Sequence, residues 1–96
     1  MTVSLSTHVL NTATGRPAAG VAVELLSATD RIARVETDGD GRARLAESLE
    51  PGTYRLVFRP PSPFFTRVEL EIVLEDGHYH VPLLISPFSC ASYRGS

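Results

Sequence analysis

The sequence contains no lysine, because all nine of its positively charged residues are arginines. Covalent chemistry on a lysine amine is therefore excluded, and only guanidinium or imidazole groups remain to hold an anionic or carbonyl-rich ligand. The single cysteine, Cys90, cannot form an internal disulfide. We interpret it as a small hydrophobic residue of the core or of an interface, in a protein that works in a reducing, cytoplasmic environment.

Long apolar runs and a strong net charge are also missing. No apolar segment is long enough to cross a membrane, and nothing after Met1 resembles an export signal. The formal net charge of −2 gives no electrostatic reason to expect nucleic acid or a membrane surface as a partner. The sequence therefore favours an ordinary soluble globular protein.

Several motifs of known chemistry are absent. The chain has no Gly-x-Ser-x-Gly, phosphate-binding loop, His-Glu-x-x-His or Cys-x-x-Cys, which argues against serine hydrolase, nucleotide, zincin and redox functions. The segment Asp38-Gly39-Asp40-Gly41 superficially matches a calcium loop, but Leu49 stands where the twelfth position needs a carboxylate. We predict a hairpin turn there, with Arg42 at the start of the next strand.

A hydrophobic period of two dominates the chain, and breakers such as Gly and Pro interrupt it at short intervals. The 96 residues are enough for one domain, which we place at residues 1–96. Short strands at regular spacing, with no helical window, predict an all-β sandwich of two antiparallel sheets. The expected strands are Val3–Leu10, Val21–Leu25, Ile32–Thr37, Ala43–Glu50, Tyr54–Arg59, Arg67–Glu75, His78–Ile85 and Phe88–Ser92.

The three histidines are the first candidates for chemistry. His78 and His80 are two residues apart on an expected strand, so they share a face and could flank a small ligand or a metal. They could equally be half-exposed strand residues with ordinary hydrogen bonds. His8 lies among core-forming residues, where a buried, hydrogen-bonded imidazole is a more common role than catalysis.

Six segments together resemble the transthyretin-like 5-hydroxyisourate hydrolases of purine catabolism, and the resemblance runs nearly end to end. The first and last of them discriminate most strongly, whereas the middle ones also occur in prealbumin-type binding modules. They are Leu5–Leu10, Thr14–Ala18, Thr37–Arg42, Gly52–Arg55, His78–Leu84 and Tyr93–Ser96.

The resemblance implies a transthyretin/prealbumin-like sandwich of two antiparallel four-stranded sheets. It further implies a homotetramer, a dimer of dimers, with active sites at the dimer–dimer interface. The implied reaction opens the ring amide of 5-hydroxyisourate to give 2-oxo-4-hydroxy-4-carboxy-5-ureidoimidazoline, without metal or cofactor. By position, the catalytic residues would be His8, Arg42, His80 and Ser96, and the substrate-binding residues His8, Arg42, Tyr93, Arg94 and Gly95.

These residue types suit the implied reaction. A ring carbonyl needs an activated water and a donor for the developing oxyanion. One imidazole, His8 or His80, would act as general base, and Arg42 would polarise the carbonyl or hold the anionic ring. The sequence leaves open which imidazole takes this role.

The chain also departs from the family pattern. The segment Pro60–Thr66 is short where family members have a helix, so we expect that helix to be lost. A second deletion is expected around Ser27–Arg31. By resemblance the strand that contains Cys90 lies in the tetramer interface, where this cysteine could alter packing.

Two other functions compete with hydrolysis. The first is a noncatalytic binding module for a small ligand, as in the hormone-carrying relatives that share the fold. The second is metal-assisted hydrolysis by His78, His80 and His8, which lacks a defined fourth ligand.

Overall fold

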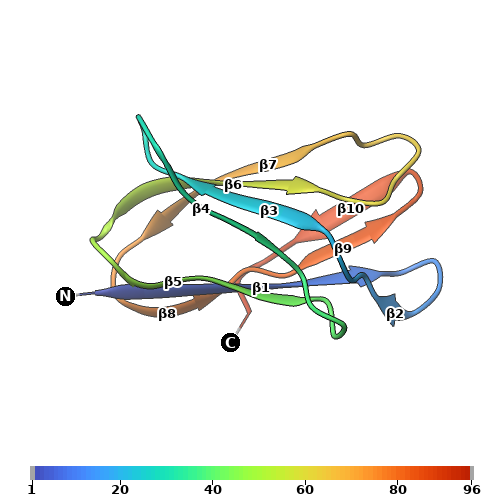
Figure 1. Cartoon of the computed structure of the whole chain (residues 1–96), viewed down its shortest axis with the longest axis horizontal. Helices are drawn as coiled ribbons and strands as arrows, with labels where there is room; N and C mark the ends of the chain where they lie inside the picture. Colours follow the sequence, from blue (N-terminus) through green and yellow to red (C-terminus); the bar gives the residue numbers. More distant parts are fainter. Residues whose placement is uncertain (1, 96) are drawn as a thin grey trace.

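A computed structural model describes residues 2–95 and contains strands and loops only in that range (Figure 1). Within it no helix is long and apolar enough to cross a membrane. The loss of the short helix expected at Pro60–Thr66 is confirmed. The strands are β1 (Val3–Asn11), β2 (Arg16–Pro17), β3 (Ala22–Leu26), β4 (Arg31–Glu36), β5 (Arg42–Leu49), β6 (Gly52–Arg59), β7 (Val68–Leu74), β8 (Gly77–His80), β9 (Leu83–Ser86) and β10 (Ser89–Ser92).

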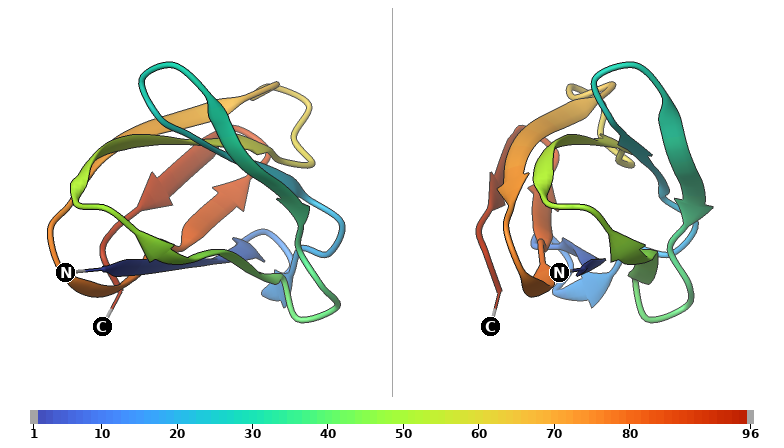
Figure 2. Two further views of the ribbon diagram at one scale, coloured as in Figure 1. Left: turned by 60° about the vertical axis from the view of Figure 1, so that its left-hand side comes forward. Right: turned by 90° about the vertical axis from the view of Figure 1, so that its left-hand side faces the viewer.

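The strands form two facing sheets, which confirms the predicted sandwich (Figures 1 and 2). One sheet has the order β4-β3-β6-β7 and is antiparallel throughout. The other sheet is built around β1, which pairs with β5 and β2 antiparallel and with β8 and β9 parallel, while β10 pairs with β9. The expectation of purely antiparallel sheets is therefore wrong for two pairings of β1.

The second sheet contains six strands rather than the expected four, because the position on each side of β1 is divided between two strands. The expected strand His78–Ile85 is divided into β8 and β9 at Pro82, which has no N–H group for a ladder hydrogen bond. The preceding Val81 still donates its N–H to the carbonyl of Ser6 at 2.9 Å, so the row continues beside β1. The two-residue β2 extends the row of β5 along the other side of β1.

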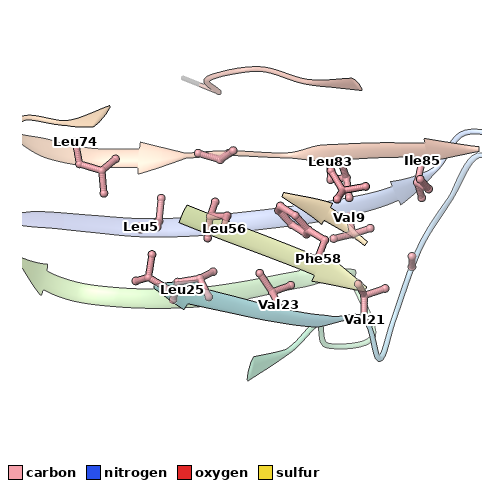
Figure 3. Close-up of a cluster of buried hydrophobic side chains, with 14 of the residues drawn as sticks. Leu5, Val9, Val21, Val23, Leu25, Leu56, Phe58, Leu74, Leu83 and Ile85 are labelled. Atoms are coloured by element: carbon pink, nitrogen blue, oxygen red, sulfur yellow. The ribbon is translucent and has the colours of Figure 1, made fainter. Parts of the chain in front are cut away.

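The core lies between the two sheets, where leucine, valine, isoleucine and phenylalanine side chains from both layers meet (Figure 3). Along β1 the side chains of Val3, Leu5 and Val9 point into this core. Because a strand has a period of two, His8 lies on the opposite, outer face and is only half-buried. The interpretation of His8 as a core histidine is therefore wrong. Thr7 is the buried polar neighbour instead, and its hydroxyl donates to the Val81 carbonyl at 2.7 Å.

The turn Asp38–Gly41 is not a hairpin, although its sequence predicted one. It joins β4, which pairs with β3, to β5, which pairs with β1, so the chain crosses from one sheet to the other. The crossing is tight, because Val9 donates its N–H to the Gly41 carbonyl at 2.7 Å. Gly41 has φ 75°, and a Cβ atom there would collide with the Val9 carbonyl oxygen.

Candidate active site

The outer face of β5, β1 and β8 carries a polar groove of about 440 Å³. Strand register brings its side chains together: His8 is paired with Arg42, and Ser6 is flanked by Arg44 on one side and His80 on the other. Ser4 is paired in the same way with His78. The groove is lined by Ser6, Thr7, Asp38, Arg42, Ala43, Arg44, His78 and His80.

His80 is the half-buried imidazole of this groove. Burial lowers its pKa below the ordinary value of 6.5, and electrostatic repulsion from His8, Arg42 and His78 lowers the pKa further. The Nδ1 atom lies 2.9 Å from the Ser6 hydroxyl. At neutral pH the ring is therefore uncharged, and Nε2 is the nitrogen left for a ligand or a water molecule.

His8 is anchored to the turn that follows β4. Its Nε2 lies 2.8 Å from the carbonyl oxygen of Asp40. Because a carbonyl only accepts hydrogen bonds, Nε2 carries the proton, and a neutral His8 has its lone pair on Nδ1. The rings of His8 and His80 are 6.5 Å apart between centroids, so both imidazoles belong to one site.

The Asp38 carboxylate organises the turn that carries Arg42 into the groove. Its Oδ1 accepts the backbone N–H of Asp40 at 2.8 Å and that of Arg42 at 3.0 Å. These backbone hydrogen bonds, from Arg42 first and then Asp40, lower the pKa of Asp38 below its usual value. The side chain that the calcium-loop pattern singled out therefore has a local role, which is to fix the backbone beside Arg42.

The C-terminal segment reaches the site at only one described residue. Gly95 donates its N–H to the His80 carbonyl at 2.6 Å, and a Cβ atom at Gly95 would lie 2.7 Å from Cδ2 of His80. Glycine is therefore the only residue type that fits at position 95 without displacing this imidazole. Ser96 lies outside the described residues.

Tyr93 and Arg94 are not brought into the histidine groove. They line a second hollow of about 340 Å³, where the edge strand β7 approaches the C-terminal segment. The guanidinium carbon of Arg94 lies 4.0 Å from the centroid of the Tyr79 ring, which is a cation–π arrangement. The structure therefore gathers four of the predicted site residues, which are His8, Arg42, His80 and Gly95.

The sequence interpretation missed the hydroxyls that connect the histidines. Ser6 contacts both imidazoles of β8, and Ser4 contacts His78. Arg44 lines the groove as well, although no motif pointed to it. Counting back from His8 in steps of two would have found both serines, because alternate residues of a strand share one face.

Two alternatives from the sequence can be compared with the described part of the chain. Among residues 2–95, no group of three His, Cys, Asp or Glu side chains is arranged to hold a metal ion. The metal-assisted alternative therefore has no ligand set there. Cys90 is exposed on β10, so its interpretation as a core residue is wrong, and its place in an interface stays a prediction.

Fold and site together define a class of protein: a transthyretin-type β-sandwich with an imidazole and guanidinium site on an outer sheet face. The chain belongs to the HIUase/Transthyretin family, whose model matches residues 5–95. Two 5-hydroxyisourate hydrolases, from Caulobacter vibrioides and Deinococcus radiodurans, are each 42% identical to it. The alignments cover 96% of this chain and 97% and 95% of those proteins, respectively.

Solved structures agree with this assignment. The structure of Klebsiella pneumoniae 5-hydroxyisourate hydrolase has a TM-score of 0.89 at 35% identity, and the match covers 98% of this chain and 99% of that one. Transthyretin from Sparus aurata has a TM-score of 0.83 at 27% identity over 95% of both chains. The Caulobacter alignment extends over 112 positions, more than the 96 residues present here, so gaps fall in this chain.

Proposed function

We propose that this protein hydrolyses 5-hydroxyisourate to 2-oxo-4-hydroxy-4-carboxy-5-ureidoimidazoline in urate degradation. The observation that carries the proposal is that Arg42 and His80 line one groove of a size suited to a small ring, with His8 beside them, 6.5 Å from His80 between ring centroids. The full-length similarity to proteins named 5-hydroxyisourate hydrolase supports the same reaction.

His80 is the proposed general base. Its lowered pKa keeps the imidazole neutral at physiological pH, and Nε2 is free to take a proton from an attacking water. His8 donates from Nε2 to the turn, so it is better placed to orient substrate or water through its other nitrogen. Arg42 polarises the ring carbonyl and stabilises the oxyanion that forms on it.

The C-terminal residues have different degrees of support. Gly95 packs on His80, and we propose that the adjoining Ser96 is catalytic because of this proximity in the chain. Tyr93 and Arg94 are proposed substrate-binding residues on the family resemblance, since they line another hollow within their own copy. No cofactor is part of the proposal.

We further propose one domain over residues 1–96 that assembles as a homotetramer, a dimer of dimers, in the cytoplasm. The groove lies on an outer sheet face and is open on one side, which a second copy could close. Phe88 and Tyr93, which are exposed outside the groove, offer further apolar surface for contact between copies. The single cysteine suits a reducing compartment.

The competing proposal is a noncatalytic binding module. It is favoured by the fold match to sea bream transthyretin, one structure of which is a complex with thyroxine. The polar groove argues for chemistry instead, because an apolar carrier site would not need two imidazoles and two guanidinium groups.

One experiment separates the two proposals. Purified protein is mixed with freshly generated 5-hydroxyisourate, and the ultraviolet decay is compared with the spontaneous rate. A hydrolase accelerates the decay, and the acceleration disappears in His8→Ala and His80→Ala. A folded protein that binds the substrate without accelerating its decay would establish the binding module.

A further inference from the structure

Four side chains form one hydrogen-bonded row along the outer face of β1 and β8. Ser4 Oγ lies 2.7 Å from Nδ1 of His78, and Nε2 of the same ring lies 3.1 Å from Ser6 Oγ. Ser6 Oγ also lies 2.9 Å from Nδ1 of His80. His78 is exposed and His80 half-buried. The row therefore leads from the imidazole in the groove to one that is open to solvent.

The donors and acceptors of this row restrict one another. The Ser6 hydroxyl has one proton, so it can donate to only one of the two imidazoles and must accept from the other. If Ser6 donates to His80, both neutral rings carry their proton on Nε2. If Ser6 donates to His78, both carry it on Nδ1. The row thus has two consistent orientations, in which the two histidines share a tautomer.

We propose that Ser6, His78 and Ser4 form a proton relay that links His80 to solvent, with Ser6 and His78 as positioning residues. The inference rests on the proposed hydrolysis, because His80 is the base that the relay would serve. It goes beyond that proposal by giving His78 and the two serines a part in the reaction.

The relay balances the protons of both halves of the reaction. In the orientation in which both rings carry their proton on Nδ1, Nε2 of His80 takes a proton from water and the Nδ1 proton of His80 passes to Ser6. The Ser6 proton passes to Nε2 of His78, and the Nδ1 proton of His78 passes to Ser4. Ser4 then releases one proton to solvent. Hydroxide attacks the ring carbonyl. His80 then gives its Nε2 proton to the departing ring nitrogen, and the row returns to its first orientation by taking one proton from solvent at Ser4.

The charges around His80 explain why a relay is useful there. Arg42 on β5 adds positive charge, and the imidazoles of His8 on β1 and His78 on β8 also disfavour a second proton on His80. Arg44 lines the same groove and is paired with Glu47 at 3.1 Å. Among the described residues that line the groove, the only carboxylate is Asp38. A doubly protonated His80 is therefore unfavourable. A proton that leaves through Ser4 lets His80 accept another without gaining a net charge.

Nitrogen-15 NMR of the histidine rings, at about pH 8 and without substrate, tests the row directly. We expect His78 and His80 to have the same neutral tautomer, because Ser6 has one proton to donate. Different tautomers in the two rings would overturn the relay. This measurement needs no activity, so it remains decisive for the relay even if the protein proves not to hydrolyse 5-hydroxyisourate.

Kinetics test the function of the row. Ser6→Ala should lower kcat about tenfold with little change in KM, and Ser6→Thr should restore it because the hydroxyl is kept. Thr53→Ala, an exposed hydroxyl on β6 in the other sheet, is the matched control and should leave both constants unchanged. An unchanged kcat in Ser6→Ala, or an effect on KM alone, would overturn the proposal.

His78 allows a second test that does not depend on the folding of the Ser6 variants. Because His78 is exposed, free imidazole can reach the space that His78→Ala leaves. We expect kcat of this variant to fall severalfold and to rise again with added imidazole, whereas the unmodified protein should not respond. A His78→Ala protein that keeps full activity, or that loses activity without rescue, would contradict a relay through this ring.

Discussion

The arginines on the two outer faces of the sandwich differ in their charged partners. On the sheet formed by β4, β3, β6 and β7, Glu24 lies 3.2 Å from Arg31 and 3.9 Å from Arg59. Arg55 is similarly paired with Glu69 at 3.8 Å. Each guanidinium of these pairs faces a carboxylate across neighbouring strands. This face is a solvated surface on which charges of both signs alternate.

The groove face has less of this neutralisation, because Arg44 is paired with Glu47 at 3.1 Å whereas Arg42 has no such pair among the described residues. The groups around Arg42 are the imidazoles of His8 and His80 and the Asp38 carboxylate, which accepts its backbone N–H. Alternate positions of β1 on this face carry Ser4, Ser6 and His8, none of which is a carboxylate. The difference teaches that an arginine without an ion-pair partner marks the site better than the number of arginines does. An uncompensated positive charge favours the binding of a negatively charged ligand.

The comparison predicts that arginines of the two faces differ most in their effect on catalysis. Arg42→Ala and His80→Ala should each lower turnover by at least ~100-fold, since they remove oxyanion stabilisation and the general base. Arg59→Ala is the control from the other face. The ultraviolet decay of 5-hydroxyisourate, corrected for the spontaneous rate, measures all three. Near-normal turnover in either groove variant would remove that residue from the mechanism.

The contact between Gly95 and His80 gives the next largest effect. In Gly95→Ala the new methyl group would lie 2.7 Å from Cδ2 of His80, so the imidazole must move. We expect kcat to fall on the order of tenfold, because misplacement of a catalytic group by a fraction of an ångström is costly. Gly39→Ala is the matched control, since a Cβ there meets nothing within 4 Å. Equal activity of the two variants would contradict this positioning role.

Much of the fold could be predicted from the sequence, because alternation along a strand is local information. The period of two in residues 68–74 gave the strand and its buried face correctly. The connections could not be predicted. Asp38-Gly39 and Asp76-Gly77 both precede a new strand and signal hairpins, yet each joins strands of different sheets. Turn chemistry fixes the local backbone and does not decide which strand becomes the partner.

The site could be predicted only in part for a related reason. Family resemblance pointed to His8, Arg42 and His80, and the register of β5, β1 and β8 brings them together. That register also places Ser6 between two imidazoles, and it rests on the parallel pairing of β1 with β8, which joins residues far apart in the chain. Such long-range pairing depends on the whole core and leaves no local signal.

The lowered pKa of His80 on the groove face predicts a moderate effect of pH on folding stability and on kcat/KM. Because the folded-state pKa of His80 lies below 6.5, the unfolded chain binds more protons than the folded chain as the pH falls. The contribution of His80 to folding stability is therefore fully present above pH 6.5 and is lost as the pH falls through the folded-state pKa. The acid limb of kcat/KM should likewise have its midpoint below pH 6.5. His80→Asn should flatten the stability profile, measured by urea denaturation from pH 5 to pH 8. A profile that is steeper in the variant would reverse the assigned sign.

The smallest expected effect lies on the paired face and completes the comparison. Arg55 and Glu69 are each about one third exposed, at 36% of their side-chain surface, and their closest atoms are 3.8 Å apart. Such pairs are weakened by water and salt, so Arg55→Ala should cost less than about 1 kcal/mol of unfolding free energy and leave hydrolysis unchanged. Urea denaturation at low and high salt measures the effect, which should shrink as salt is added. A large loss of activity in Arg55→Ala would mean that the paired face also contributes to the site, and the contrast between the two faces would fail.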